Sequence, residues 1–219
     1  MTITTPSADY YRLGDFSFTG FSGKRYVAFD FEATGPNPTS DSITQIGAII
    51  VCDSGIHDHE FFASYVRPRK PIPEKIEALT GVTNALVADA PHFSEAYARF
   101  QEFCSDAVLV TQCGYEFDFP LLDQECDLHQ IPRQQNLRLD TKAIFALLHP
   151  EQTQIFSTNF LSDYYAIDRS LFKRHDALGD ARLIAQLFFA EMAEARHMKI
   201  DSIAAEQPIE IKRFILPPL

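Results

Sequence analysis

Hydrophobic positions between residues 25 and 66 form short runs, and sequences typical of turns lie between these runs. Three of these runs have the β-branched and aromatic composition of strands, and they comprise residues 25–32, 43–51 and 59–66. A turn signal at Gly35-Pro36 follows the first run, and another at Ser54-Gly55 precedes the third. We therefore predict three consecutive strands in this part of the chain.

Beyond residue 68 the hydrophobic positions mostly recur with the spacing of helices. The longest such pattern occupies residues 174–197 and gathers its apolar side chains on one side. The other expected elements are short helices between residues 73 and 84, helices at 91–104, 119–129 and 159–165, a helix that ends at 148, and short strands at 107–111 and 137–139. Strands followed by alternating helices and strands predict an α/β fold with a mixed central sheet flanked by helices.

The two ends of the chain show no clear pattern. Residues 1–24 are aromatic and polar without periodicity, and we expect them to form an N-terminal arm. Residues 199–219 finish in a proline-rich stretch and are expected to be a C-terminal tail. One domain would then span residues 25–198, and the arm and tail offer contacts for a possible homodimer.

Composition and length indicate a single globular domain with extensions. The chain has 219 residues, of which 46% are hydrophobic and 22% are charged, which is ordinary for a soluble protein. No apolar run approaches the roughly 20 residues of a membrane span, and the first 20 residues lack the features of a signal peptide. The four cysteines are scattered and form no CxxC pair, which favours reduced thiols. We expect a cytoplasmic protein without a membrane partner.

The formal net charge of −11 argues against a protein that grips long duplexes, because such binding depends on many contacts of Lys and Arg with phosphates. An enzyme that takes only the end of a strand is not excluded. Carboxylates that hold metal ions add to the acidity, and the bound ions reverse the local field.

Asp30 and Glu32 lie at the end of the first predicted strand. Side chains two residues apart on a strand point to the same face, and their Cα atoms are about 6.6 Å apart at a rise of about 3.3 Å per residue. Two neighbouring carboxylates repel each other, and a hard divalent cation relieves the repulsion. The spacing alone is weak support, because Asp58-His59-Glu60 and Asp123-Gln124-Glu125 share it. The other interpretation of Asp30 and Glu32 is a solvated strand end.

Asp118 lies between a predicted buried strand and a helix, immediately before Phe119-Pro120. Its simplest interpretation is an N-cap that satisfies free backbone N–H groups, although a helix start at a sheet edge also suits a metal ligand.

His175 and Asp180 are five residues apart, which places them about 140° apart on an ideal helix. They converge only if His175 lies in the loop before the helix, with Asp180 in the first turns and Asp176 as N-cap. The alternative is an exposed histidine and an aspartate that the helix dipole favours.

Taken together, these residues resemble the DEDDh 3′→5′ exonucleases, a family of the RNase H-like superfamily that includes DnaQ-like proofreading subunits and RNase T. The resemblance covers roughly residues 26–192. The motifs that carry it are Phe29-Asp30-Phe31-Glu32-Ala33-Thr34-Gly35, Tyr65-Val66-Arg67-Pro68, Leu79-Thr80-Gly81-Val82-Thr83, Phe117-Asp118-Phe119-Pro120-Leu121-Leu122, Leu139-Asp140-Thr141 and the run from His175 to Ala181. The chain departs from the family at Gln112-Cys113-Gly114, where many members have His-Asn.

The resemblance implies an RNase H-like fold and hydrolysis with two Mg²⁺ or Mn²⁺ ions about 3.5–4 Å apart. The implied metal ligands are the four carboxylates of Asp30, Glu32, Asp118 and Asp180. His175 would be the general base on the attacking water, and the product would be a nucleoside 5′-monophosphate. The expected partner is the 3′ end of single-stranded DNA or RNA.

The loop formed by Ala33, Thr34 and Gly35 is expected to approach the terminal nucleotide. Leu79 and Phe117 are candidates to wedge against or stack on terminal bases, since proteins that bind single strands commonly use stacking. Core packing is an equally good interpretation of Phe117.

Two other functions remain open at this point. One is a non-catalytic relative that binds nucleic-acid ends or acts as a scaffold. The other is a metal-free carboxylate-pair hydrolase such as a glycosidase, which sensitivity to EDTA would separate from a nuclease.

Overall fold

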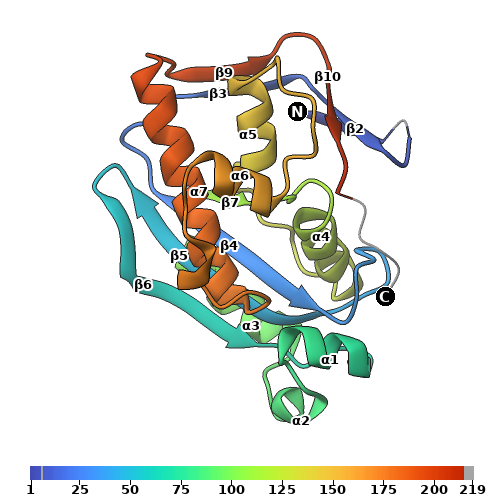
Figure 1. Ribbon diagram of the computed structural model, residues 1–219. Helices are drawn as coiled ribbons and strands as arrows, with labels where there is room; N and C mark the ends of the chain where they lie inside the picture. Colours follow the sequence, from blue (N-terminus) through green and yellow to red (C-terminus); the bar gives the residue numbers. More distant parts are fainter. Residues whose placement is uncertain (6, 215–219) are drawn as a thin grey trace.

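The computed structural model describes residues 1–5 and 7–214 (Figure 1). Its strands are β1 (Thr2–Thr4), β2 (Tyr10–Gly14), β3 (Phe16–Thr19), β4 (Tyr26–Ala33), β5 (Ile43–Cys52), β6 (Gly55–Tyr65), β7 (Val108–Thr111), β8 (Arg138–Asp140), β9 (Ser202–Ala205) and β10 (Ile209–Lys212). Its helices are α1 (Glu74–Thr80), α2 (Asn84–Val87), α3 (Phe93–Cys104), α4 (Asp118–Leu128), α5 (Thr141–Leu148), α6 (Thr158–Tyr164), the short 3-10 helix η1 (Arg169–Leu171) and α7 (Ala177–His197).

The central sheet has five strands in the order β6-β5-β4-β7-β8. Strands β4, β5 and β6 pair antiparallel, whereas β7 is parallel to β4 and β8 is parallel to β7. The predicted α/β fold with a mixed sheet is therefore confirmed. Strand β6 begins four residues earlier than predicted and α7 begins three residues later.

Helices cover both faces of this sheet, and the alternation of side chains along β4 decides what each face meets. Phe29 packs against Phe100 of α3 and Phe119 of α4. Tyr26, on the opposite face, packs against Phe188 of α7. Figure 1 shows α7 in front of the sheet and α3 behind it. Because side chains alternate, Asp30 shares the α7 face with Tyr26.

The terminal segments contain strands that the sequence pattern did not predict. Strand β2 pairs with both β1 and β10, and β3 pairs with β9, so the N-terminal strands lie beside the C-terminal strands (Figure 1). In β3 the side chains alternate, with Phe16 and Phe18 buried in the core. The expected arm and tail thus pair with each other as antiparallel strands.

Among the helices of residues 1–5 and 7–214, none combines the length and apolarity that a bilayer span requires.

Candidate active site

Asp30 and Glu32 lie at the end of β4, opposite Gly47 and Gln45 of β5. The pairing of the two strands is irregular between Glu32 and Ala33, at the place where β4 turns away. Asp30 lines a cavity of about 490 Å³, and Glu32 is 9% exposed. Neither residue is the freely solvated strand end that the sequence left open.

The start of α7 lies directly against β5, and two contacts hold it there. A Cβ atom on Gly47 would lie 2.1 Å from the carbonyl carbon of Ala177, so only glycine allows this approach. The amide N–H of Ala177 donates to Oε1 of Gln45 at 3.2 Å. Asp176 caps the helix by accepting from the N–H of Gly179 at 3.1 Å. These contacts bring the first turn of α7 beside Asp30 and Glu32.

His175 lies in the loop before α7, which is the placement that convergence with Asp180 requires. Its backbone is left-handed, with φ at 56°, a conformation uncommon for residues other than glycine. The N–H of His175 donates to Oδ2 of Asp180 at 2.7 Å, and Nε of Arg174 lies 2.8 Å from Oδ1 of the same carboxylate. Asp180 therefore fixes the loop that carries the exposed imidazole.

Asp118 is the first residue of α4 and not its N-cap, because Phe117 occupies the cap position and makes no side-chain bond there. Oδ2 of Asp118 accepts from Oγ1 of Thr111 at 3.2 Å. Oδ1 is buried and has no hydrogen-bond partner within the described part of the chain. The capping interpretation is wrong, and the free buried oxygen fits a metal ligand.

Burial raises the pKa values of all four carboxylates, and repulsion within the cluster adds to this for Asp30 and Glu32. Desolvation by burial raises the pKa of Glu32 to about 8 and that of Asp118 to about 7. For Asp30, burial raises the pKa well above its ordinary value, and the charges of Asp180, Asp118 and Glu32 raise it further. The pKa of Asp180 is also raised by burial, while the charge of Arg174 opposes this. A bound divalent cation would offset the repulsion within this cluster and lower these pKa values.

Three of the site residues have donor atoms close enough together to hold one metal ion. Carboxylate oxygens of Glu32 and Asp180 and a ring nitrogen of His175 lie within 4.8 Å of one another. Asp30 and Asp118 approach from the side of the 490 Å³ cavity, which both of them line. Hard oxygen donors of this kind suit Mg²⁺ or Mn²⁺. The residues present therefore fit a metal site.

Comparison with known proteins identifies the family. The sequence model of the family described as "Exonuclease", of the RNase T type, matches residues 27–188. The chain belongs to this exonuclease family. The motifs that predicted it, from Phe29 to Ala181, all lie within the matched residues.

Individual relatives of this exonuclease chain agree with that assignment. The PolC-type DNA polymerase III of Caldanaerobacter subterraneus subsp. tengcongensis is 27% identical over 195 residues, which are 86% of this chain and 13% of the polymerase. The chain thus spans a small part of this curated relative.

Solved structures establish the fold. The nuclease domain of 3′hExo, described as a DEDDh family member bound to rAMP, superposes with a TM-score of 0.70 at 16% identity, over 80% of this chain and 94% of that domain. Exonuclease I of E. coli in complex with a dT13 oligonucleotide gives a TM-score of 0.63 at 18% identity, over 80% and 42% of the two chains. The predicted RNase H-like fold is confirmed.

The residues predicted to bind substrate lie in different settings. Phe117 lines the 490 Å³ cavity with Asp30, although it also packs against the core. Ala33 and Thr34 are buried, and Oγ1 of Thr34 donates to Asp41 at 2.8 Å. Gly35 follows in the same loop, and its α-carbon faces the Asp41 carboxylate. Their roles, and that of the 46% exposed Leu79, stay predictions.

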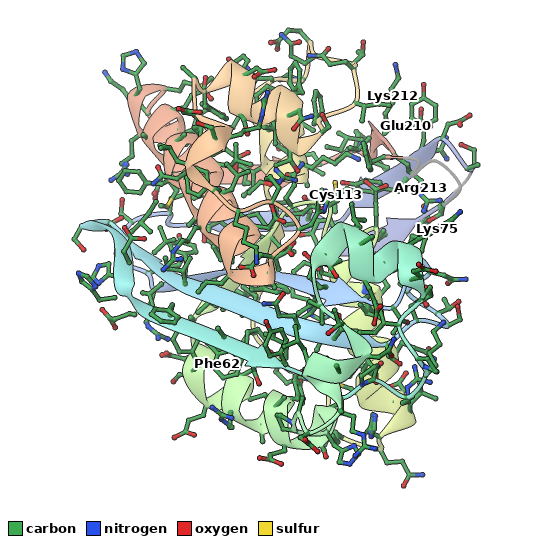
Figure 2. The ribbon with its side chains drawn as sticks, turned by 60° about the horizontal axis from the view of Figure 1, so that its bottom comes forward. Phe62, Lys75, Cys113, Glu210, Lys212 and Arg213 are labelled. Carbon is green, nitrogen blue, oxygen red and sulfur yellow. The ribbon has the colours of Figure 1, made fainter. Side chains whose placement is uncertain are left out.

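Sequence reasoning missed several residues that shape the cavities. Cys113 and Arg213, both labelled in Figure 2, line the 490 Å³ cavity, as do Ala8, Glu116 and Phe214. A neighbouring cavity of about 380 Å³ is lined by Cys113, Ser157, Thr158, Asn159, Arg174, His175 and Phe214. Several of these come from the terminal segments and the helix α6, so no local motif marks them.

The Leu139-Asp140-Thr141 motif has a clear structural role next to the site. The buried carboxylate of Asp140 caps α5 by accepting from the N–H of Lys142 at 2.9 Å. It also accepts from the N–H groups of Cys113 at 3.2 Å and Tyr115 at 3.1 Å. Asp140 thereby fixes the loop that leads into Asp118.

Proposed function

We propose that this chain is a divalent-metal-dependent 3′→5′ exonuclease that releases nucleoside 5′-monophosphates from the 3′ end of single-stranded DNA or RNA. The observation that supports it best is the convergence of three distant segments. The end of β4, the start of α4 and the loop before α7 bring Asp30, Glu32, Asp118, Asp180 and His175 to one site. Family membership alone would also fit a binding protein that has lost catalysis.

The four carboxylates would hold the metal ions, and the buried free oxygen of Asp118 is available for this role. Bound Mg²⁺ or Mn²⁺ would supply charge stabilisation to the phosphodiester and lower the pKa of the attacking water. His175 takes a proton from that water through its ring, since it is exposed beside Glu32 and Asp180. Asp180 holds the His175 backbone and so orients the base.

The choice of substrate rests on charge and on the structural relatives. Exonuclease I is described in complex with a thymidine oligonucleotide, and 3′hExo in complex with rAMP. A net charge of −11 favours contact with a strand end over extended contact with a duplex. These observations support single-stranded 3′ ends and do not separate DNA from RNA.

The test is digestion of 5′-labelled single-stranded DNA and RNA with Mg²⁺, with Mn²⁺ and with EDTA. We expect a ladder of products shortened from the 3′ end, only with metal, and none from Asp180→Asn. The matched control is Asp58→Asn, which alters another D-x-E pair whose aspartate is 69% exposed, and it should digest like the native chain. Cleavage in EDTA, or by the Asp180 variant, would contradict the proposal.

A further inference from the structure

The C-terminal strand carries two residues into the candidate active site. Strand β10 pairs with β2, and just beyond it the N–H of Arg213 donates to the carbonyl of Asp9 at 2.7 Å. Arg213 and Phe214 then line the same cavity as Asp30 and Asp118. Phe214 also lines the neighbouring cavity, which contains His175. Phe214 therefore lines both the cavity that contains Asp30 and Asp118 and the cavity that contains His175.

Glu116 anchors this segment to the loop before α4. Its carboxylate is 7% exposed and accepts from the N–H of Phe214 at 3.1 Å. The same oxygen lies 3.5 Å from Nε of Arg213, and the other forms an ion pair with the fully buried Lys142 of α5. A carboxylate held between two cations is itself fixed. The backbone at Phe214 is thus tied to the walls of the site.

The Phe214 side chain, in contrast, is not used by the fold. It is 44% exposed, and it is absent from the hydrophobic core and from the ring–ring contacts of the described residues. The Phe214 ring is in contact with water beside a buried carboxylate cluster. Covering such a ring with a planar apolar surface is favourable, because it removes apolar area from water. A nucleobase supplies such a surface, and every base has a π-face.

We propose that Phe214 stacks on a base of the nucleic-acid strand whose 3′ end lies at Asp30 and Asp118. This inference rests on the proposed exonuclease function. Phe214 lies outside residues 27–188, so the family match does not include it. The anchored backbone lowers the entropic cost of holding the ring in place. Arg213, which pairs with Glu116, lines the same cavity and contributes positive charge there.

The test compares Phe214→Ala with Phe214→Trp in steady-state digestion of single-stranded oligonucleotides. Stacking on one base is worth about 1–3 kcal/mol, which corresponds to an increase in KM of about 5- to 150-fold for Phe214→Ala. We expect kcat to change less than about twofold, and Phe214→Trp to keep the native KM. Phe61→Ala is the matched control, because Phe61 is 48% exposed on β6 and lines neither cavity.

Oligonucleotides with one abasic residue, moved stepwise through the last nucleotides of the 3′ end, identify the stacked base. At the correct position the native chain and Phe214→Ala should have the same KM, because the partner of the ring is gone. A penalty that persists at every position would overturn the inference. So would an unchanged KM, or faster digestion by Phe214→Ala, which would mean that the segment blocks the cleft.

Failure of the proposed function gives a different result. If the native chain and Phe61→Ala digest no oligonucleotide with Mg²⁺ or Mn²⁺, the exonuclease proposal itself is contradicted. If both digest normally and Phe214→Ala matches them, only the stacking role is lost. Thermal unfolding of Phe214→Ala should match the native chain, since the exposed ring contributes little to the core.

Discussion

Gly47→Ala would place a methyl group where the backbone of α7 now lies. The new Cβ would be 2.1 Å from the carbonyl carbon of Ala177 and 2.2 Å from the nitrogen of Leu178. Ordinary contact begins near 3.4 Å, so the start of α7 must retreat by about 1.3 Å. Both obstacles are backbone atoms, and no rotamer change relieves the clash. The first turn of α7 carries Asp180, so the candidate site must distort with it.

We expect the substitution to affect both catalysis and stability. A displacement of about 1 Å in a catalytic group costs about 10²-fold in rate, and overpacking costs about 1–3 kcal/mol of stability. We expect kcat/KM for a 5′-labelled oligonucleotide to fall about 100-fold while the chain stays folded by circular dichroism. The affinity for Mn²⁺, measured by calorimetry, should fall as well.

Gly14→Ala is the control for adding a methyl group to a buried strand. Its Cβ would meet Pro208 at 3.5 Å, which is ordinary contact, and we expect native activity. Native kcat/KM and Mn²⁺ affinity in a folded Gly47→Ala would refute the reasoning that this contact positions the catalytic group.

Three further predictions follow from the site and the core. His175→Asn keeps a residue that tolerates the left-handed turn but removes the base, so kcat should fall about 10²–10⁴-fold; a native rate would exclude the role of base. Saturating Mn²⁺ should raise Tm by about 5–10 °C. The rise should be larger at pH 8.5 than at pH 6, because the raised pKa values of Glu32 and Asp118 make protons compete with the ion. An equal rise at both pH values would contradict this. Burial raises the pKa of Glu191, whose carboxylate oxygens have no partner in the described chain, so the folded state binds the extra proton and the free energy of unfolding falls as pH rises above about 4.5. In urea unfolding curves Glu191→Gln should show a smaller decline than the native chain, because the other buried carboxylates still contribute, whereas Glu194→Gln, where hydrogen bonds lower the pKa, should not reduce it.

Much of the fold is predictable because its elements carry their own patterns. Strand β4 and helix α7 are long enough for periodicity to define them, and both appear close to their expected positions. The terminal strands are three to five residues long, which is too short for such a signal. Their partners lie far along the chain, as in the pairing of Tyr11 with Ile211. Local sequence does not encode that pairing.

The candidate site, too, was predictable from the sequence only in part. Helix geometry gave the condition under which His175 and Asp180 converge, which is a loop position for the histidine, and the structure has His175 in that loop. The interpretation of Asp118 as a cap was wrong, because Phe117 takes the cap position and the carboxylate turns to Thr111. The approach of Gly47 to Ala177 depends on tertiary packing that no motif marks.

The chain departs from the family pattern at Gln112-Cys113-Gly114. Gln112 and Cys113 line the same cavity as the C-terminal residues Arg213 and Phe214. Gln112 is committed to the fold, since its Nε2 donates to the carbonyl of Phe156 at 2.9 Å. The backbone N–H of Cys113 donates to Asp140, and its thiol is a weaker hydrogen-bonding group than the side chain of histidine or asparagine. The wall beside them is completed by Phe214, which lies 26 residues beyond the end of the family match at residue 188. A chain cut at residue 198 would lose this ring together with β9 and β10, and would leave β3 without its partner. The cavity at the candidate active site therefore depends on a segment that the family motifs do not contain.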